Sequence, residues 1–204
     1  MGRDFAMNRL LQGDVGSGKT VVAAVALYAN YLTGYQGAMM VPTEILAEQH
    51  YASLRAFLAE TGIEITLLTG RMTEAMKRSV LGQMQMGIVD IVVGTHALIQ
   101  ENVQFHNLGL VITDEQHRFG VLQRALLRQG SRDPHTLVMT ATPIPRTVAH
   151  AVYGDLDISG IDELPPGRQE VATYRVANDQ AEQWWEFFCK KLKEGRQGYV
   201  VVPT

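Results

Sequence analysis

The sequence has almost no cysteine and no long apolar run. A single cysteine, Cys189, excludes an internal disulfide and fits a reducing compartment. The longest apolar runs, such as Val21–Leu27, are far too short to span a bilayer, and no signal peptide follows Met1. Internal repeats and low-complexity segments are also absent. We therefore expect a cytoplasmic protein without a membrane partner.

The composition permits a sizeable core without a bulk preference for one kind of partner. Hydrophobic residues make up 46% of the 204 residues and charged residues 19%, which is typical of a folded globular chain. The net charge of −3 gives no bulk argument for nucleic acid, although a local patch can still bind it.

Short apolar runs alternate with helical stretches, and this pattern predicts an α/β fold. Continuous apolar strands between helices are typical of a mostly parallel sheet with helices on both faces. In such sheets ligands bind at the carboxyl ends of the strands. The predicted strands are Arg9–Gln12, Ala38–Pro42, Ile65–Thr69, Ile88–Gly94, Leu108–Asp114 and Leu137–Ala141. The predicted helices are Lys19–Leu32, Glu44–Glu60, Glu74–Met86, Val121–Gln129 and Pro145–Tyr153.

A break follows at Leu164-Pro165-Pro166-Gly167, where two prolines and a glycine end any regular element. We expect a first domain at residues 1–163, a linker at 164–170 and the beginning of a second domain at 171–204. That last part is predicted to hold strands Val171–Val176 and Tyr199–Val202 around a helix at Asp179–Glu194. It is too small to bury its own core, so we expect the chain to be shortened at its carboxyl end. The segment MNRLLQG reaches a buried strand almost at once, so we expect it to be shortened at the front too.

A glycine-rich loop lies between the first predicted strand and helix. Its sequence GDVGSGKT matches G-x-x-x-x-G-K-[ST] in full, in the strand–loop–helix context that supports the motif. Such a loop turns backbone N–H groups toward phosphate oxygens, next to the positive end of the helix dipole. We therefore predict a nucleotide site formed by Gly13, Asp14, Val15, Gly16, Ser17, Gly18, Lys19 and Thr20. Lys19 is expected to reach the β- and γ-phosphates, and Thr20 to ligate Mg²⁺.

Two acidic residues end the apolar strand Leu108–Thr113, in the segment LGLVITDEQH. A phosphate-binding loop needs a carboxylate on a neighbouring strand to hold its metal. We predict that Asp114 holds Mg²⁺ through its water shell and that Glu115 orients and deprotonates the attacking water. The N-K-x-D segment that reads guanine in signalling GTPases is absent, so this class is a poor alternative.

Several segments together resemble superfamily-two DNA helicases and, within them, the RecG family of ATP-dependent branch-migration helicases. They are MNRLLQGDVGSGKT, VPTEILAEQH, GTHALIQ, DEQHRFGVLQR and MTATPIPRT. The resemblance covers nearly the whole chain. It implies a RecA-like motor lobe, followed by the start of a second RecA-like lobe, that uses ATP and Mg²⁺ to move along branched DNA in repair and recombination.

The same resemblance implies DNA contacts at the ends of two strands. Pro42, Thr43 and Glu44 match one family segment, and Gly94, Thr95 and His96 match a second. Hydroxyls and backbone amides there would bind phosphates without reading bases. Thr43 is also a candidate N-cap of the next helix, and both interpretations can hold together.

Five residues resemble the elements that couple nucleotide state to lobe movement: Gln116, His117, Thr140, Ala141 and Thr142. The threonine hydroxyls are expected to bond to Asp114 or His117 across neighbouring strand ends. The arginine fingers of the second lobe and an N-terminal wedge domain that binds DNA junctions would lie outside this chain. We therefore expect feeble ATP hydrolysis and no unwinding by these residues alone.

Two other functions remain open. The motor of a transcription-repair coupling factor is similar, although that family favours a second Glu where this chain has Gln116. A nucleotide-gated switch without translocation is the alternative from the class of binding proteins. The predicted DNA-contact segments argue against it.

Overall fold

Parallel strands form one sheet in the order β3-β4-β2-β5-β6-β1-β7. The computed structural model describes residues 5–100, 102–114, 133–142, 156–163 and 172–202. The strands are β1 (Asn8–Gly13), β2 (Gln36–Met40), β3 (Ile65–Leu68), β4 (Ile91–Gly94), β5 (Leu108–Asp114), β6 (His135–Thr140) and β7 (Asp157–Ile161). The helices around them are α1 (Lys19–Tyr31), α2 (Glu44–Phe57), α3 (Glu74–Gln85) and the short 3₁₀ helix η1 (His96–Ile99).

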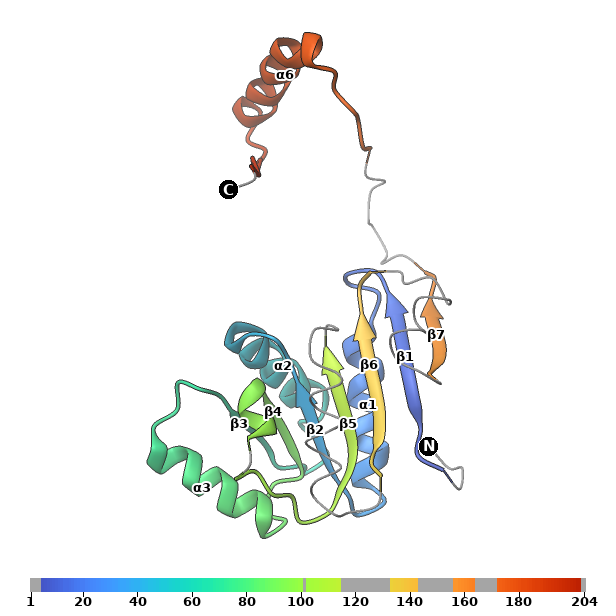
Figure 1. The fold of residues 1–204 in the computed structure, drawn as a ribbon, viewed down its shortest axis with the longest axis vertical. Helices are drawn as coiled ribbons and strands as arrows, with labels where there is room; N and C mark the ends of the chain where they lie inside the picture. Colours follow the sequence, from blue (N-terminus) through green and yellow to red (C-terminus); the bar gives the residue numbers. More distant parts are fainter. Residues whose placement is uncertain (1–4, 101, 115–132, 143–155, 164–171, 203–204) are drawn as a thin grey trace. The chain divides into compact units, whose positions relative to one another are not determined.

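Helices cover both faces of this sheet, as predicted for the α/β fold. Alternate residues along each strand point to opposite faces, so Met39 of β2 packs under α1 and α2, whereas Met40 packs toward α3 and η1. Figure 1 shows α1 and α2 on one side of the strands and α3 on the other. Because every pairing is parallel, all the strand carboxyl ends share one edge.

Helix α2 begins at that edge and ends at the opposite one. Its N-cap is Thr43, whose side chain accepts a hydrogen bond from the Leu46 backbone N–H at 3.3 Å. Ala47, His50 and Leu54 form its buried stripe, with the three- and four-residue spacing of one helix face. The stripe packs α2 onto the sheet and fixes which of its side chains point toward the strand ends.

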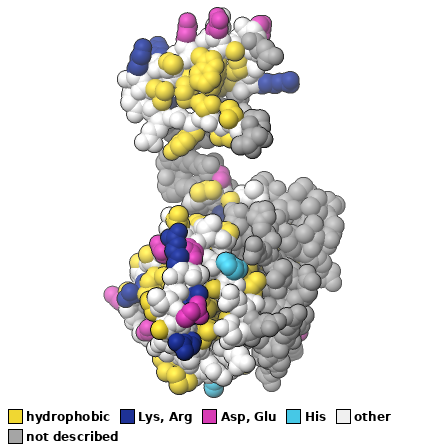
Figure 2. Space-filling model, turned by 60° about the vertical axis from the view of Figure 1, so that its left-hand side comes forward, with side chains coloured by type: hydrophobic (Ala, Val, Ile, Leu, Met, Phe, Trp, Pro, Cys, Tyr) yellow, Lys and Arg dark blue, Asp and Glu magenta, His cyan; other side chains and the backbone are white. Residues whose placement is uncertain are grey.

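The chain divides into two compact units, Met1–Pro166 and Gly167–Thr204. The second contains the 3₁₀ helix η3 (Asn178–Gln180) and helix α6 (Ala181–Lys193), on which no residue is buried. Trp184, Trp185 and Phe188 contact one another on this helix. Figure 2 shows hydrophobic side chains gathered on one face of this unit, bordered by charged ones. The assignment of residues 171–204 to a second motor lobe stays a prediction.

Three features of the fold differ from the predicted elements. The strand β7 is not predicted, because the segment DISGI has no continuous apolar run. Among the described strands it pairs with β1 alone. The predicted strands Val171–Val176 and Tyr199–Val202 are wrong: residues 172–176 and 199–202 form no strand. A strand needs a neighbour to satisfy its backbone, and the described residues of this unit offer none.

The predicted helices Val121–Gln129 and Pro145–Tyr153 lie outside the described residues. Among the residues that are described, no helix is both long and apolar enough to cross a membrane.

Candidate functional site

The glycine-rich loop joins the end of β1 to the start of α1, as the motif predicts. Gly18 is the N-cap of α1 with φ of 97° and ψ of 11°. This left-handed conformation is strongly disfavoured for residues other than glycine. The loop is closed by a hydrogen bond from the Ser17 N–H to the Asp14 carbonyl at 3.1 Å. The backbone therefore turns at the helix start, where N–H groups without helical partners can face a phosphate.

Polar groups of this loop fit a phosphorylated ligand. The Lys19 ammonium donates to the carbonyl oxygens of Gly13 at 2.7 Å and Asp14 at 2.9 Å, which holds it over the loop. The Ser17 hydroxyl is buried without a hydrogen-bond partner in the described part of the chain. An ammonium, hydroxyls and amide N–H groups in one loop are the donor set that phosphate oxygens require.

The carboxylate predicted to hold a metal lies at the same edge of the sheet. Asp114 is the last residue of β5 and is level with Met139 of β6, which is level with Leu11 of β1. Two strand spacings, about 10 Å, therefore separate Asp114 from Leu11, and β1 continues two residues past that level to Gly13. With Thr20 in the first turn of α1, this edge offers oxygen ligands of the kind that Mg²⁺ binds. Glu115, Gln116 and His117 lie outside the described residues.

His50 is a site residue that the sequence analysis missed. Its Nε2 lies 2.8 Å from Asp114 Oδ2, and the two side chains are only 11% and 17% exposed. The available signal was a histidine within the buried stripe of an amphipathic helix, where an imidazole needs a polar partner. Nothing local to α2 identifies that partner, because Asp114 is far along the chain.

The two predicted DNA-contact segments also lie at this edge, with different exposures. Pro42, Thr43 and His96 are exposed. Thr95 is 2% exposed, and its hydroxyl has no partner among the described residues. At Gly94 a Cβ atom would overlap the Leu68 carbonyl oxygen, so the close approach of β3 and β4 accounts for that glycine.

Glu44 is held in an ion pair. Its Oε2 lies 2.7 Å from Arg71 Nε, and its Oε1 accepts the Arg71 backbone N–H at 3.1 Å. Arg71 follows β3 and its side chain is 79% exposed. The acidic residue in the first DNA-contact segment is therefore accompanied by a cation that the sequence analysis did not link to it.

The predicted bond between the Thr140 hydroxyl and Asp114 is not found. Instead Thr140 Oγ1 accepts the Thr142 N–H at 3.1 Å and lies 3.0 Å from Thr142 Oγ1. The reason is strand alternation: Thr140 shares a face with Val138, whereas Asp114 shares a face with Ile112 on the α1–α2 side. Ala141 follows β6 directly and is partly exposed.

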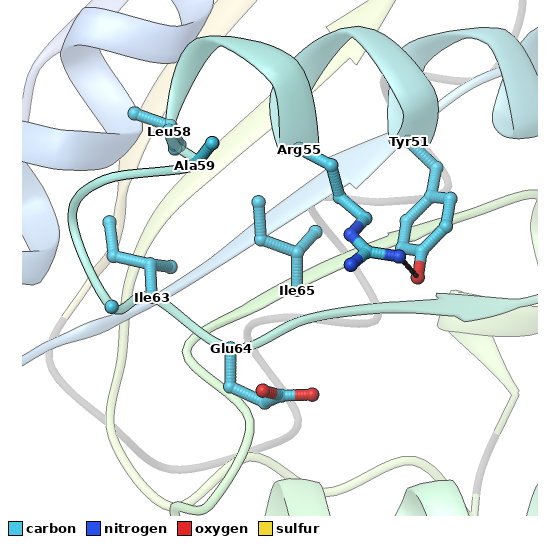
Figure 3. Close-up of a pocket in the computed structure, with 8 residues that line it drawn as sticks. Tyr51, Arg55, Leu58, Ala59, Ile63, Glu64 and Ile65 are labelled. Carbon is cyan, nitrogen blue, oxygen red and sulfur yellow. Dashed lines mark hydrogen bonds between the residues drawn. The ribbon is translucent and has the colours of Figure 1, made fainter.

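A separate hollow of about 280 Å³ lies at the opposite edge, between the end of α2 and the start of β3. Figure 3 shows Arg55 and Tyr51 of α2 on one side of it and Glu64 on the other. Arg55 donates to the Tyr51 hydroxyl at 3.4 Å. None of the predicted site residues lines this hollow, so the candidate site remains the carboxyl edge of the sheet.

Comparisons with known proteins identify the family of this chain. The model of the DEAD/DEAH box helicase family matches residues 2–151. The ATP-dependent DNA helicase RecG of Bacillus subtilis is 55% identical over 203 residues, covering 100% of this chain and 30% of that protein. RecG of Aquifex aeolicus is 54% identical over 205 residues, and the match covers 100% of this chain and 26% of that RecG protein.

A solved structure described as RecG bound to a three-way DNA junction is also similar. It is 50% identical, with a TM-score of 0.82, covering 98% of this chain and 27% of that chain. This chain thus spans under a third of the length of these RecG proteins. The predicted resemblance and RecA-like fold are confirmed, and the chain belongs to the DEAD/DEAH box helicase family.

Proposed function

We propose that this chain is the ATP-binding motor lobe of a DNA helicase that couples ATP hydrolysis to translocation on branched DNA. The observation that carries the proposal is the glycine-rich loop at the end of β1 with Asp114 at the end of β5, two strands away. The similarity to RecG proteins over the full length of the chain supports the same function. The whole protein would remodel stalled forks and Holliday junctions in repair and recombination, in the bacterial cytoplasm at the nucleoid.

Each residue of the site has a proposed role. The amides of Gly13–Gly18 and the Lys19 ammonium would bind the phosphates of ATP, and Thr20 and Asp114 would hold Mg²⁺. When bound, Mg²⁺ neutralises the charge that develops on the phosphate oxygens. Glu115, which follows Asp114 directly, would orient and deprotonate the attacking water.

DNA would lie against the strand ends β2 and β4. The exposed Thr43 and His96 and the backbone around Pro42 would contact phosphates without reading bases. This suits movement along any sequence. The buried hydroxyl of Thr95 would need a local rearrangement to join them.

Full activity would also need parts of the helicase beyond these residues. An arginine finger supplied by a second lobe contributes a factor of about a thousand or more in phosphoryl transfer. A wedge domain would supply junction binding. We therefore propose slow, DNA-insensitive ATP hydrolysis for this chain.

The test is ATP binding and hydrolysis by the chain, with and without branched DNA. Lys19→Ala should abolish both, because it removes the only side-chain cation of the loop. Lys77→Ala is the matched control, since it breaks only an exposed ion pair with Glu74 on α3, a kind of pair that contributes little. Binding that survives Lys19→Ala, or no binding by the folded wild-type chain, would contradict the proposal.

A further inference from the structure

The imidazole of His50 and the carboxylate of Asp114 form a sequestered pair between α2 and the end of β5. The Nε2–Oδ2 distance is 2.8 Å, and His50 has neighbours Ala47 and Leu54 along the same buried stripe. A polar ring in such a stripe is costly unless it is hydrogen-bonded. The bond is therefore what makes a histidine acceptable at this position.

Two periodicities bring these side chains together. Along β5, Leu110 and Ile112 pack under α1 and α2, and Asp114 follows on the same face two residues later. Along α2, His50 lies seven residues after the Thr43 N-cap, about 10 Å along the helix axis. The pairing thus follows from the fold and does not depend on a loop conformation.

The chemistry of the pair fixes which group donates. An ionised carboxylate only accepts hydrogen bonds, so Nε2 of His50 carries the hydrogen. This bond engages Oδ2, and within the described residues no hydrogen bond to Oδ1 of the same carboxylate is seen, so that oxygen can make another contact. It also restrains the rotation of the carboxylate about its bond to Cβ, which has no strong intrinsic preference.

We propose that His50 is a positioning residue that holds the Asp114 carboxylate in one orientation for the magnesium–nucleotide complex. The proposal rests on the proposed function, because it assumes that Asp114 serves the metal. Partners that orient ligand side chains change metal affinity or activity by about 10- to 100-fold when they are removed. His50 would therefore determine how well Mg²⁺ strengthens nucleotide binding, without itself touching the nucleotide.

The experiment measures binding of a fluorescent ATP analogue to the chain across a Mg²⁺ titration and, separately, in EDTA. His50→Leu should raise the Mg²⁺ concentration for half-maximal binding by about tenfold. Binding in EDTA should stay within about twofold of wild type, since the glycine-rich loop supplies that affinity. His50→Gln should recover most of the loss, because its Nε2 can donate from a similar position.

Three comparisons separate positioning from general damage. In an Asp114→Asn background, His50→Leu should add no further change, since both act on one carboxylate. His106→Leu makes the same substitution at an exposed histidine on the loop before β5 and should match wild type. Should His50→Leu fail to fold, His50→Asn replaces it, because that amide is one methylene too short to reach Asp114.

A wild-type Mg²⁺ dependence in folded His50→Leu or His50→Asn would overturn the proposal. So would a full additional loss in the Asp114→Asn background. Failure of the proposed function has a different signature: the wild-type chain itself would then show no nucleotide binding that Lys19→Ala removes.

Discussion

The amino and carboxyl edges of the parallel sheet differ in how many of their buried polar side chains are hydrogen-bonded. At the amino edge, the Gln36 amide donates to the carbonyls of Met84 and Val89 at 3.0 and 2.6 Å. Its oxygen accepts the N–H groups of His106 and Asn107 at 2.8 and 3.1 Å. At the carboxyl edge, the hydroxyls of Ser17, Thr95 and Thr113 are buried without a partner among the described residues.

The hydrogen-bonded side chains of the amino edge stabilise the fold, whereas the unpaired hydroxyls of the carboxyl edge are available to a ligand. At the amino edge, buried side chains form hydrogen bonds with the backbone of the loops. Besides Gln36, the Asn30 amide donates to the carbonyls of Tyr35 and Gln36 at 2.9 and 3.0 Å. At the carboxyl edge three hydroxyls lack a partner among the described residues, one in the glycine-rich loop and two near the ends of β4 and β5, and leaving such groups unpaired costs free energy. Asn8, at the start of β1, is an exception at the amino edge, since its Oδ1 also has no described partner.

The largest expected effect is at the amino edge. Gln36→Leu is similar in size but removes four hydrogen bonds to backbone groups. The Met84 carbonyl and the His106 N–H keep a bond to each other at 3.3 Å, whereas the Val89 carbonyl and the Asn107 N–H lose their bond to Gln36, so we expect a loss of about 3–5 kcal/mol in the free energy of unfolding. Urea denaturation measures it. Gln104→Leu, at an exposed position, is the control and should change stability by less than about 0.5 kcal/mol. If Gln36→Leu lowered the free energy of unfolding no more than the control does, the proposed difference between the two edges would be contradicted.

An intermediate effect of opposite kind is expected at the carboxyl edge. Thr113→Val replaces a buried hydroxyl that has no described partner, so stability should stay equal or rise by up to about 1 kcal/mol. Thr61→Val is the matched substitution at the amino edge. It removes the hydrogen bond from the Thr61 hydroxyl to the Leu58 carbonyl at 2.6 Å and should cost about 1 kcal/mol. Equal losses in both variants, measured by thermal unfolding, would contradict the comparison.

The smallest effect concerns pH and His135, at the start of β6. Its Nδ1 accepts the Met7 N–H at 2.8 Å, and burial is the main cause that lowers its pKa below the usual 6.5. The folded chain then binds fewer protons than the unfolded chain below pH 6.5, so stability is full above that pH and falls as the pH drops through the lowered value.

His135→Asn keeps an acceptor near the Nδ1 position and removes the titration. Urea denaturation at several pH values between 7.5 and 5 should therefore show a shallower decline for this variant than for wild type. An identical decline in the two proteins would show that His135 does not contribute.

Strands were predictable where burial and apolar character coincide. Both ends of β5, Leu108–Asp114, are predicted correctly, because its apolar run is continuous and an acidic residue follows it. β2 was predicted two residues late, since Gln36 and Gly37 lack apolar side chains although both are buried. β4 was predicted three residues early, because Ile88-Val89 is apolar, yet the Ile88 N–H still bonds to the Gln83 carbonyl after α3.

The site residues also fall into two groups, those in local sequence patterns and those that depend on contacts between distant segments. Gly13–Thr20 and Asp114 could be predicted because a phosphate loop and a strand-terminal acid are local patterns, and their roles stay a prediction. The pairs His50–Asp114 and Glu44–Arg71 were not found, since each joins segments that only the folded sheet brings together. The bond from Thr140 to Asp114 is not formed because side chains alternate between the faces of the sheet, and the alternative bond to His117 stays a prediction.

The ion pair between Glu44 and Arg71 also bears on how salt would affect DNA binding. At the proposed DNA-contact edge the acid and the cation offset each other, and the remaining groups are hydroxyls, amides and His96. A contact surface with so little net charge displaces few of the counterions condensed on DNA, and the salt dependence of affinity scales with the number displaced. DNA held by this edge alone would therefore dissociate only slightly more readily as the ionic strength rises.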